Sequence, residues 1–254
     1  MKKMALIFRI PVLTLLSGAL LFTSCNKDKQ ISAADELGTI ESIEDDASAD
    51  IAYSGSADEA LDLGMQENPD LFGYPSLSYS TDPNPSPRLS GNVSGRLQRC
   101  YNVTIDTTLN TKFPVTVTID FGGGCTGRDG RLRKGKIITV YTGKLRIPGS
   151  KATTTFDNYY VDSIKVDGIH ILSNISSNNI PTFQREIKNG QLTWPSGRWV
   201  KRDAIRTIAM IKGAATLNDR TDDEFAITGS GKGENSRGKT WAHEITEDLI
   251  DRKS

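Results

Sequence analysis

The sequence predicts an all-β protein, either an antiparallel β-sandwich or an extended β-meander, preceded by a disordered acidic tether. From residue 97 onward, apolar residues alternate with polar ones at a period of two, which is typical of half-buried antiparallel strands. Gly, Pro and Asn punctuate these runs, with no helical pattern between them. Acidic residues gather before residue 71 and basic residues after residue 87. Such segregation usually separates a tail from a folded body.

Residues 1–24 have the features of an export signal. A basic start with Lys2, Lys3 and Arg9 precedes an apolar run over 10–22. This run is shorter than the roughly 20 apolar residues that a membrane-spanning helix needs. It ends in Leu-Phe-Thr-Ser-Cys at 21–25, which resembles the lipobox of bacterial lipoproteins. The resemblance implies cleavage before Cys25 and covalent lipid on its thiol, which anchors the protein in a membrane.

The residues after Cys25 bear on the membrane involved. Asn26 stands where an Asp would resemble an inner-membrane retention signal, so the resemblance implies an outer-membrane lipid anchor. The following Lys-Asp-Lys at 27–29 is similar to the charged surface-export signals of some lipoproteins. Both a periplasmic and a surface-exposed position therefore remain open. The alternative is an ordinary secretory signal followed by an unrelated Cys.

Residues 25–87 form the predicted acidic tether. Between 26 and 70 the chain has thirteen acidic residues and only two Lys. Large apolar residues are too few there to offset the entropy lost on ordering. One short helix is expected over 58–66, capped by Ser56. We expect a solvated tether that lifts the body off the membrane. The alternative is an acidic arm that folds over the basic body.

Residues 88–254 form the predicted antiparallel β domain, which is long enough to bury a core. The alternating segments 101–106 and 113–120 predict a first hairpin. Asp167-Gly168 suits a tight turn between two strands, and Asn189-Gly190 predicts a turn or a bulge. The remaining expected strands cover 136–145, 152–160, 161–166, 169–175, 183–194, 199–211, 223–228 and 240–246.

The first hairpin also predicts a disulfide between Cys100 and Cys125. If the hairpin turns near Asn110, Cys100 lies opposite the residues just after Asp120. The three glycines at 122–124 give the slack that brings Cys125 back to it. Exported proteins meet an oxidising environment, in which such thiols pair. Catalytic or metal-binding thiols are the alternative.

A second resemblance covers about residues 97–246. The segment 118–137, which contains Asp-Phe-Gly-Gly-Gly-Cys, resembles a family of uncharacterised lipoproteins from Gram-negative bacteria. The segments Asn-Tyr-Tyr-Val at 158–161 and Trp-Pro-Ser-Gly at 194–197 add to it. The resemblance implies a β-rich exported domain and no catalytic residue.

Two groups of cations are candidate anion-binding sites. The first surrounds the expected turn at Asp129-Gly130; its members are Arg128, Arg131, Arg133, Lys134 and Lys136. The second follows one predicted strand and contains Arg198, Lys201, Arg202 and Arg206, of which the three arginines share a strand face. Their partners are an anionic glycan, lipopolysaccharide, an envelope protein or the acidic arm. A solvated face is the alternative, and nucleic acid is not expected outside the cell.

Other motifs are less informative. Residues 233–240 match the phosphate-loop pattern G-x-x-x-x-G-K-T, but that loop needs a parallel sheet and a following helix. We therefore expect a Gly-rich hairpin loop and no nucleotide. His170, His243 and the acidic residues near 219–224 lack the spacing of metal ligands. No metal and no cofactor are expected beyond the covalent lipid on Cys25.

These observations favour a non-enzymatic envelope lipoprotein that acts as a binding or structural surface module. The alternative is an enzyme that acts on envelope or extracellular glycans. Such an enzyme would need two carboxylates about 5–10 Å apart in a cleft. The sequence brings no such pair together in its predicted strands. A polar composition with 37% apolar residues excludes a multi-span membrane protein.

Overall fold

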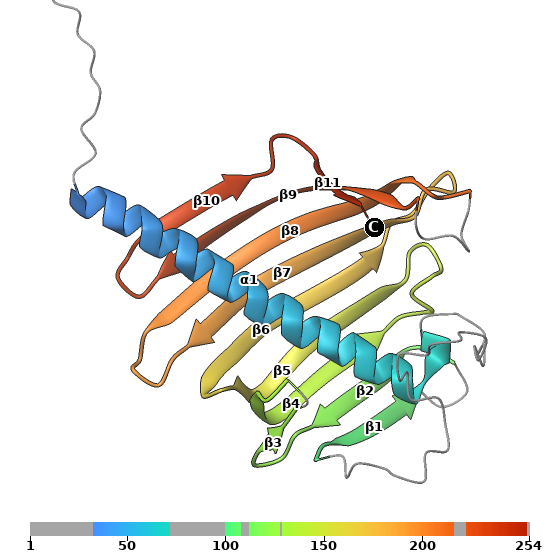
Figure 1. Ribbon diagram of the computed structural model, residues 1–254. Helices are drawn as coiled ribbons and strands as arrows, with labels where there is room; N and C mark the ends of the chain where they lie inside the picture. Colours follow the sequence, from blue (N-terminus) through green and yellow to red (C-terminus); the bar gives the residue numbers. More distant parts are fainter. Residues whose placement is uncertain (1–32, 72–99, 108–111, 128, 216–221, 253–254) are drawn as a thin grey trace, which may run out of the picture.

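The computed structural model describes residues 33–71, 100–107, 112–127, 129–215 and 222–252. These residues form one antiparallel sheet and one long helix (Figure 1). The all-β antiparallel class predicted from the alternating pattern is confirmed. No helix in this part of the chain is long and apolar enough to cross a membrane.

The strands follow one another as a meander. The main path of the sheet runs β1-β2-β4-β5-β6-β7-β8-β9-β10, while β3 pairs with β4 and β11 with β9. The eleven strands are β1 (Asn102–Thr107), β2 (Val115–Asp120), β3 (Cys125–Thr126), β4 (Leu132–Tyr141), β5 (Lys151–Val161), β6 (Ile164–Asn174), β7 (Thr182–Thr193), β8 (Trp199–Lys212), β9 (Glu224–Asn235), β10 (Thr240–Glu244) and β11 (Leu249–Arg252). Of the two predicted architectures, the described strands follow the meander.

One predicted turn lies elsewhere. The β5–β6 hairpin turns at Asp162 and Ser163, both of which have positive φ, as a two-residue hairpin turn requires. Strand β6 runs on through Asp167-Gly168, where its register with β7 shifts. Gly168 is required there because an added Cβ would lie 2.7 Å from the Cα of Gly190. Asn189-Gly190 forms the bulge that was one of its two predicted conformations.

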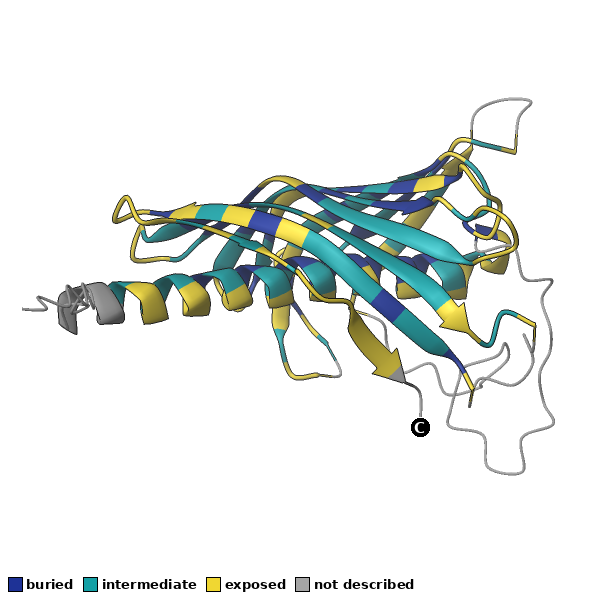
Figure 2. Cartoon of the chain, turned by 90° about the horizontal axis from the view of Figure 1, so that it is seen from above, coloured by how far each residue is buried: buried dark blue, intermediate teal, exposed yellow. Residues whose placement is uncertain are grey.

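Register shifts recur in neighbouring strands. They interrupt the β4–β5, β5–β6, β6–β7 and β7–β8 pairs. Bulges bend a strand and increase its twist. The shifts therefore curve the middle of the sheet around the helix that lies against one of its faces (Figure 2).

That helix, α1 (Ala33–Glu67), is the main difference from the predicted fold. It has 35 residues and crosses one face of the sheet diagonally, followed by the short 3-10 turn η1 (Pro69–Leu71) (Figure 1). Over 33–71 the expected solvated tether is wrong, and the acidic arm folded over the basic body is what the structure has. The expected helix over 58–66 is only its last part, and Ser56 is a buried residue inside the helix. The rest of the expected tether, 25–32 and 72–87, lies outside the described residues.

The core lies between α1 and the curved sheet. Small side chains of α1 face the strands, among them the fully buried Ala49, Ala57 and Ala60. Tyr53 is also fully buried; its ring contacts Phe156 and its hydroxyl donates a hydrogen bond to the carbonyl of Asp167. An aromatic cluster of Phe121, Phe156 and Tyr159 continues beneath the helix. Small residues let the helix approach closely, and this closeness allows its acidic side chains to reach the strands.

Candidate functional site

The interface between α1 and the sheet is built around an arginine row, which consists of Arg198, Arg202 and Arg206. In a strand, residues separated by an even number share a face, as predicted for these three. They face α1, where Asp45 pairs with Arg198 and Asp50 pairs with both Arg202 and Arg206. Asp46 adds a second carboxylate to Arg202. The arginine row therefore binds the chain's own acidic helix.

Arg202 is the centre of this interface. Its side chain has no exposed surface, and Nη1 lies 2.9 Å from Asp46 Oδ1 and donates to the Asp46 carbonyl at 2.7 Å. Its Nη2 lies 3.2 Å from Asp50 Oδ1, although neither Nη2 nor Nε has a hydrogen-bond acceptor among the described residues. A buried guanidinium is tolerated only beside compensating charge. Arg202 and the two aspartates therefore depend on one another.

Further ion pairs extend along both sides of the arginine row. Asp45 is almost fully buried and also accepts a hydrogen bond from Asn235. The indole of Trp241 donates to Asp46 at 2.9 Å. The outer pairs are Glu41 with Arg237, Asp58 with Arg185, and Glu59 with Arg133. Between Glu41 and Glu59, the acids that face the sheet are thus matched by cations of the strands.

Arg133 also belongs to the predicted basic cluster, and the structure gives that cluster internal partners. Arg133 is buried and makes two hydrogen bonds to Asp129, which lower the pKa of the Asp129 carboxyl to about 2. Burial raises the pKa of Glu59 on the other side of the guanidinium, against the attraction of Arg133. Both acids face Arg133, which leaves this member of the cluster no free anion site.

The other cations of the cluster have partners as well. Arg131 pairs with Asp162 at 2.8 Å, and Lys136 lies 3.4 Å from Asp120. The Lys134 ammonium lies over the ring of Tyr160. Arg128 lies outside the described residues. Strand pairing thus brings an acid or an aromatic ring to each of the four described cations, while Arg131, Lys134 and Lys136 keep exposed surface. Anion binding at this cluster stays a prediction.

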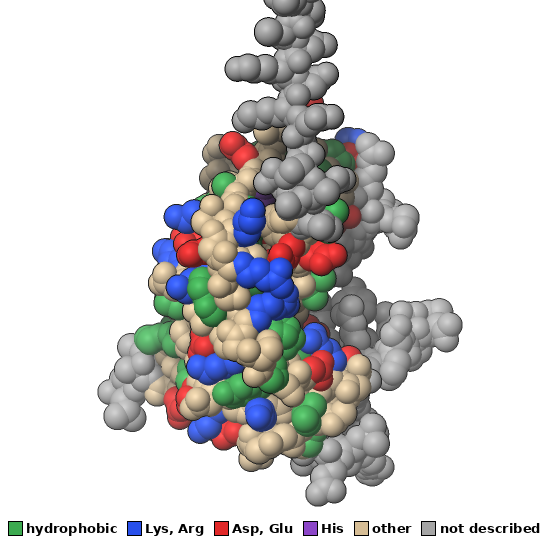
Figure 3. Space-filling view, turned by 90° about the vertical axis from the view of Figure 1, so that its left-hand side faces the viewer, with side chains coloured by type: hydrophobic (Ala, Val, Ile, Leu, Met, Phe, Trp, Pro, Cys, Tyr) green, Lys and Arg blue, Asp and Glu red, His purple; other side chains and the backbone are tan. Residues whose placement is uncertain are grey.

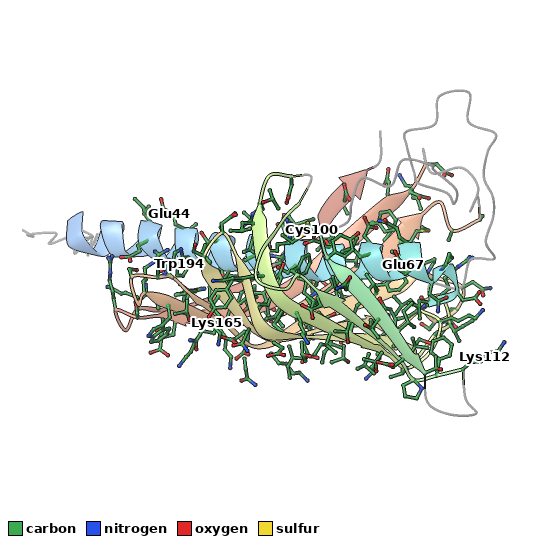
Figure 4. All side chains as sticks on the ribbon, turned by 90° about the horizontal axis from the view of Figure 1, so that it is seen from below. Glu44, Glu67, Cys100, Lys112, Lys165 and Trp194 are labelled. Carbon is green, nitrogen blue, oxygen red and sulfur yellow. A yellow bond between two sulfur atoms is a disulfide. The ribbon has the colours of Figure 1, made fainter. Side chains whose placement is uncertain are left out.

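The predicted disulfide is present. Cys100 and Cys125 are bonded, with their Cα atoms 5.2 Å apart. Cys125 is buried where the short β3 pairs with β4, while Cys100 precedes β1 at the sheet edge (Figure 4). The bond joins the edge of the sheet to the β3–β4 hairpin. Cys25, the predicted lipidation site, lies outside the described residues.

A cavity of about 100 Å³ lies between α1 and strands β6–β9. It is lined by Asp50 and Ser54 of the helix, and on the strands by His170, Arg185, Ile187, Ala204, Arg206, Ile208 and Ile227. His170 is 2% exposed. Burial, followed by repulsion from Arg185, lowers the pKa of His170 to about 4, although Asp58 opposes this shift. The imidazole is therefore neutral at pH 7. Both charged and apolar side chains line the cavity.

A second, broader hollow of about 690 Å³ opens over strands β7–β10. Most of its lining residues belong to the strand positions that face away from α1, including Glu186, Asp203, Ile205 and Glu244. Glu186 and Glu244 stand in β7 and β10, three strand spacings or about 14 Å apart. That separation exceeds the range for a pair of glycosidase carboxylates. Asp203 stands closer to Glu186, diagonally across from it on the neighbouring strand and about 7–8 Å away, but it accepts a hydrogen bond from the backbone N–H of Asn189 at 2.8 Å. Glu186 is also paired with Lys188, at 3.1 Å.

The phosphate-loop match lies in a β-hairpin, as its sequence context predicts. Residues 233–240 span the end of β9, the turn and the start of β10, with Gly238 at positive φ. Lys239 donates its backbone N–H to the side chain of Asn235.

His243 lies 3.4 Å from Asp46. In the part of the chain that the structure describes, no group of His, Cys, Asp and Glu could hold a metal ion.

Comparison with known proteins adds no relative. No protein-family model, curated protein or solved structure matches this chain. Its function is therefore argued from its own residues.

Proposed function

We propose that this protein is an outer-membrane lipoprotein whose β body is a non-enzymatic binding or structural module. The anchor is covalent lipid on Cys25, and the body lies in the periplasm or on the cell surface. The observation that supports this most is the lipobox, Leu-Phe-Thr-Ser-Cys at 21–25, at the end of the apolar run. Only seven residues lie between Cys25 and Ala33, the first residue of α1, and the eight Cα–Cα steps limit the link to about 28 Å.

The interface of α1 supports a binding or structural role over a catalytic one. The acids that face the sheet are engaged in ion pairs, so they are not free to act on a substrate. The hollow over β7–β10 is open, and its two neighbouring carboxylates have partners, since Glu186 pairs with Lys188 and Asp203 accepts a hydrogen bond from the Asn189 N–H. In the described part of the 128–136 cluster, three of the cations that an anionic glycan or lipopolysaccharide would use are already paired with acids, and Lys134 lies over the Tyr160 ring. The outer face of β7–β10, with its mixed charges and exposed Ile205, suits an envelope protein better.

Lipidation is tested by metabolic labelling with an alkyne analogue of palmitate. The parent should take up the label and fractionate with the outer membrane, and Cys25→Ala should take up none. Cys100→Ala/Cys125→Ala is the matched control, because it removes the other two thiols and should keep the label. Labelling of Cys25→Ala, or none in the parent, would refute the lipoprotein assignment.

A further inference from the structure

The outward side of α1 is unusual in its first half. Ile40, Ile43 and Ile51 are 48%, 63% and 67% exposed. With the exposed Ala47 they are spaced i, i+3, i+7 and i+11, which forms one stripe along a helix. We call these four residues the isoleucine stripe. It lies opposite the buried side that carries Asp45, Ala49 and Tyr53.

The second half of the helix lacks such a stripe. Its exposed residues are Gly55, Asp58, Asp62, Gln66 and Glu67, all polar apart from the glycine. The apolar part of the outward surface is thus confined to the half of α1 that follows Cys25 most closely. Isolated exposed apolar residues are common on protein surfaces, but an aligned set on one helix face indicates a contact.

The charges around the stripe favour a lipid surface. Asp45, Asp46 and Asp50 point into the arginine row, where their charge is compensated, which leaves Glu44 as the exposed acid beside the stripe in the described first half of α1. Arg237, with 65% of its side chain exposed, stands at the same end of the molecule as the start of α1. There Lys and Arg side chains are interspersed with acids (Figure 3). Trp194 lies at this end too, with Arg198 stacked on its ring at 3.8 Å (Figure 4). Tryptophan and cations are typical of the membrane interface.

We propose that the isoleucine stripe lies in the interface of the lipid bilayer to which Cys25 is anchored, so that α1 rests along the membrane. The inference builds on the proposed lipidation, since the anchor holds Ala33, the first residue of α1, within about 28 Å of the bilayer. Two weak attachments, a lipid and an apolar helix face, bind a membrane more firmly than either alone. The outer face of the sheet then points away from the membrane, toward a partner.

The test uses the mature chain without lipid, residues 26–254 with its disulfide formed. Flotation with phosphatidylcholine vesicles, with and without phosphatidylglycerol, measures binding. The parent should float with both kinds of vesicle. The variant Ile40→Ser/Ile43→Ser/Ile51→Ser should bind either kind at least about tenfold more weakly than the parent. The matched control Ile147→Ser/Ile175→Ser/Ile211→Ser changes exposed isoleucines outside α1 and should bind like the parent. Unchanged thermal unfolding would confirm that both variants fold.

Four results would overturn the proposal. The first is no flotation of the parent, and the second is equal flotation of the parent and the stripe variant. The third is binding that requires phosphatidylglycerol and disappears with salt, which would assign the contact to cations alone. The fourth is sedimentation in which the parent is a dimer and the stripe variant is a monomer, which would assign the stripe to contact with a second copy of the chain. Failure of this proposal can be told apart from failure of the proposed lipidation by labelling the stripe variant with the palmitate analogue in cells. Lipidation needs Cys25 and not the stripe, so the variant should still take up the label.

Discussion

The two halves of α1 are held to the sheet by different forces. From Glu41 to Asp50 the helix contacts the strands largely through ion pairs with the arginine row and Arg237. From Tyr53 to Leu61 the contact is mostly apolar and close, with Ala57 and Ala60 fully buried, although Asp58 and Glu59 also pair with strand arginines. Gly64 approaches the strands so closely that a Cβ there would lie 3.0 Å from the Tyr141 hydroxyl. The first half therefore depends more on charge, and the second half more on shape.

This difference explains why so acidic a segment is helical. Its carboxylates repel one another along the helix, for example Asp46 and Asp50 at i, i+4. Arg202 lies between those two and compensates both. Without the sheet, the first half of α1 would have both charge repulsion and an exposed isoleucine stripe. The helix thus forms because the sheet is there.

Removing the central charge should have the largest effect. Arg202→Ala leaves Asp46 and Asp50 beside each other in a buried interface, which should reduce the free energy of unfolding by about 3–5 kcal/mol. Arg237→Ala removes an exposed partner of Glu41 and should reduce it by less than about 1 kcal/mol. Urea denaturation compares the two. Similar small losses in both variants would contradict a central role for Arg202.

Acid should reduce the free energy of unfolding through His170, which lies in the middle of the interface, by somewhat less than Arg202→Ala does. His170 titrates near 6.5 when unfolded and about 4 when folded, so the unfolded chain binds more protons between these values. The contribution of neutral His170 to the free energy of unfolding is complete above pH 6.5. It is lost as the pH falls toward 4, and the loss is on the order of 3 kcal/mol. The carboxylates and guanidinium groups around it, Asp50, Asp58, Arg185 and Arg206, limit how far the cavity can relax.

Stability measured against pH in the parent and in His170→Gln checks this. The variant should lose less stability between pH 6.5 and 4 than the parent does. His243→Gln changes a half-exposed histidine at the same interface and serves as the control. Parallel curves for all three proteins would show that His170 does not contribute to the acid sensitivity.

The sequence was sufficient for the sheet and the disulfide. Alternation with period two identified the strands, and the hairpin register brought Cys125 back to Cys100. It placed one turn wrongly, because Asp167-Gly168 suits both a turn and a bulge, and only the close approach of Gly190 distinguishes them. Such a contact across strands has no local signal.

The helix was harder to predict because its stability is tertiary. A run rich in acids is usually solvated, and composition alone favours a tether. The signal that would have found α1 is the stripe of small residues at Ala49, Tyr53, Ala57, Ala60 and Gly64, with only Tyr53 large. A second signal is the match between its acids and the arginines spaced by four in β8. The acidic partners of the basic cluster at 128–136 could not be predicted for the same reason, since Asp162 and Glu59 are distant from it in sequence.

Hydrogen exchange of the amides of α1, read by mass spectrometry, tests most directly whether the acidic segment is part of the fold. The two halves should be protected like the central strands at low salt. At 1 M salt, where the Debye length falls to about 3 Å, the exposed Glu41–Arg237 pair weakens, so residues 38–44 should exchange several-fold faster. Residues 45–67, whose central ion pairs and apolar contacts are buried, should change little. Exchange of the whole segment within seconds at low salt would contradict a docked helix and restore the tether.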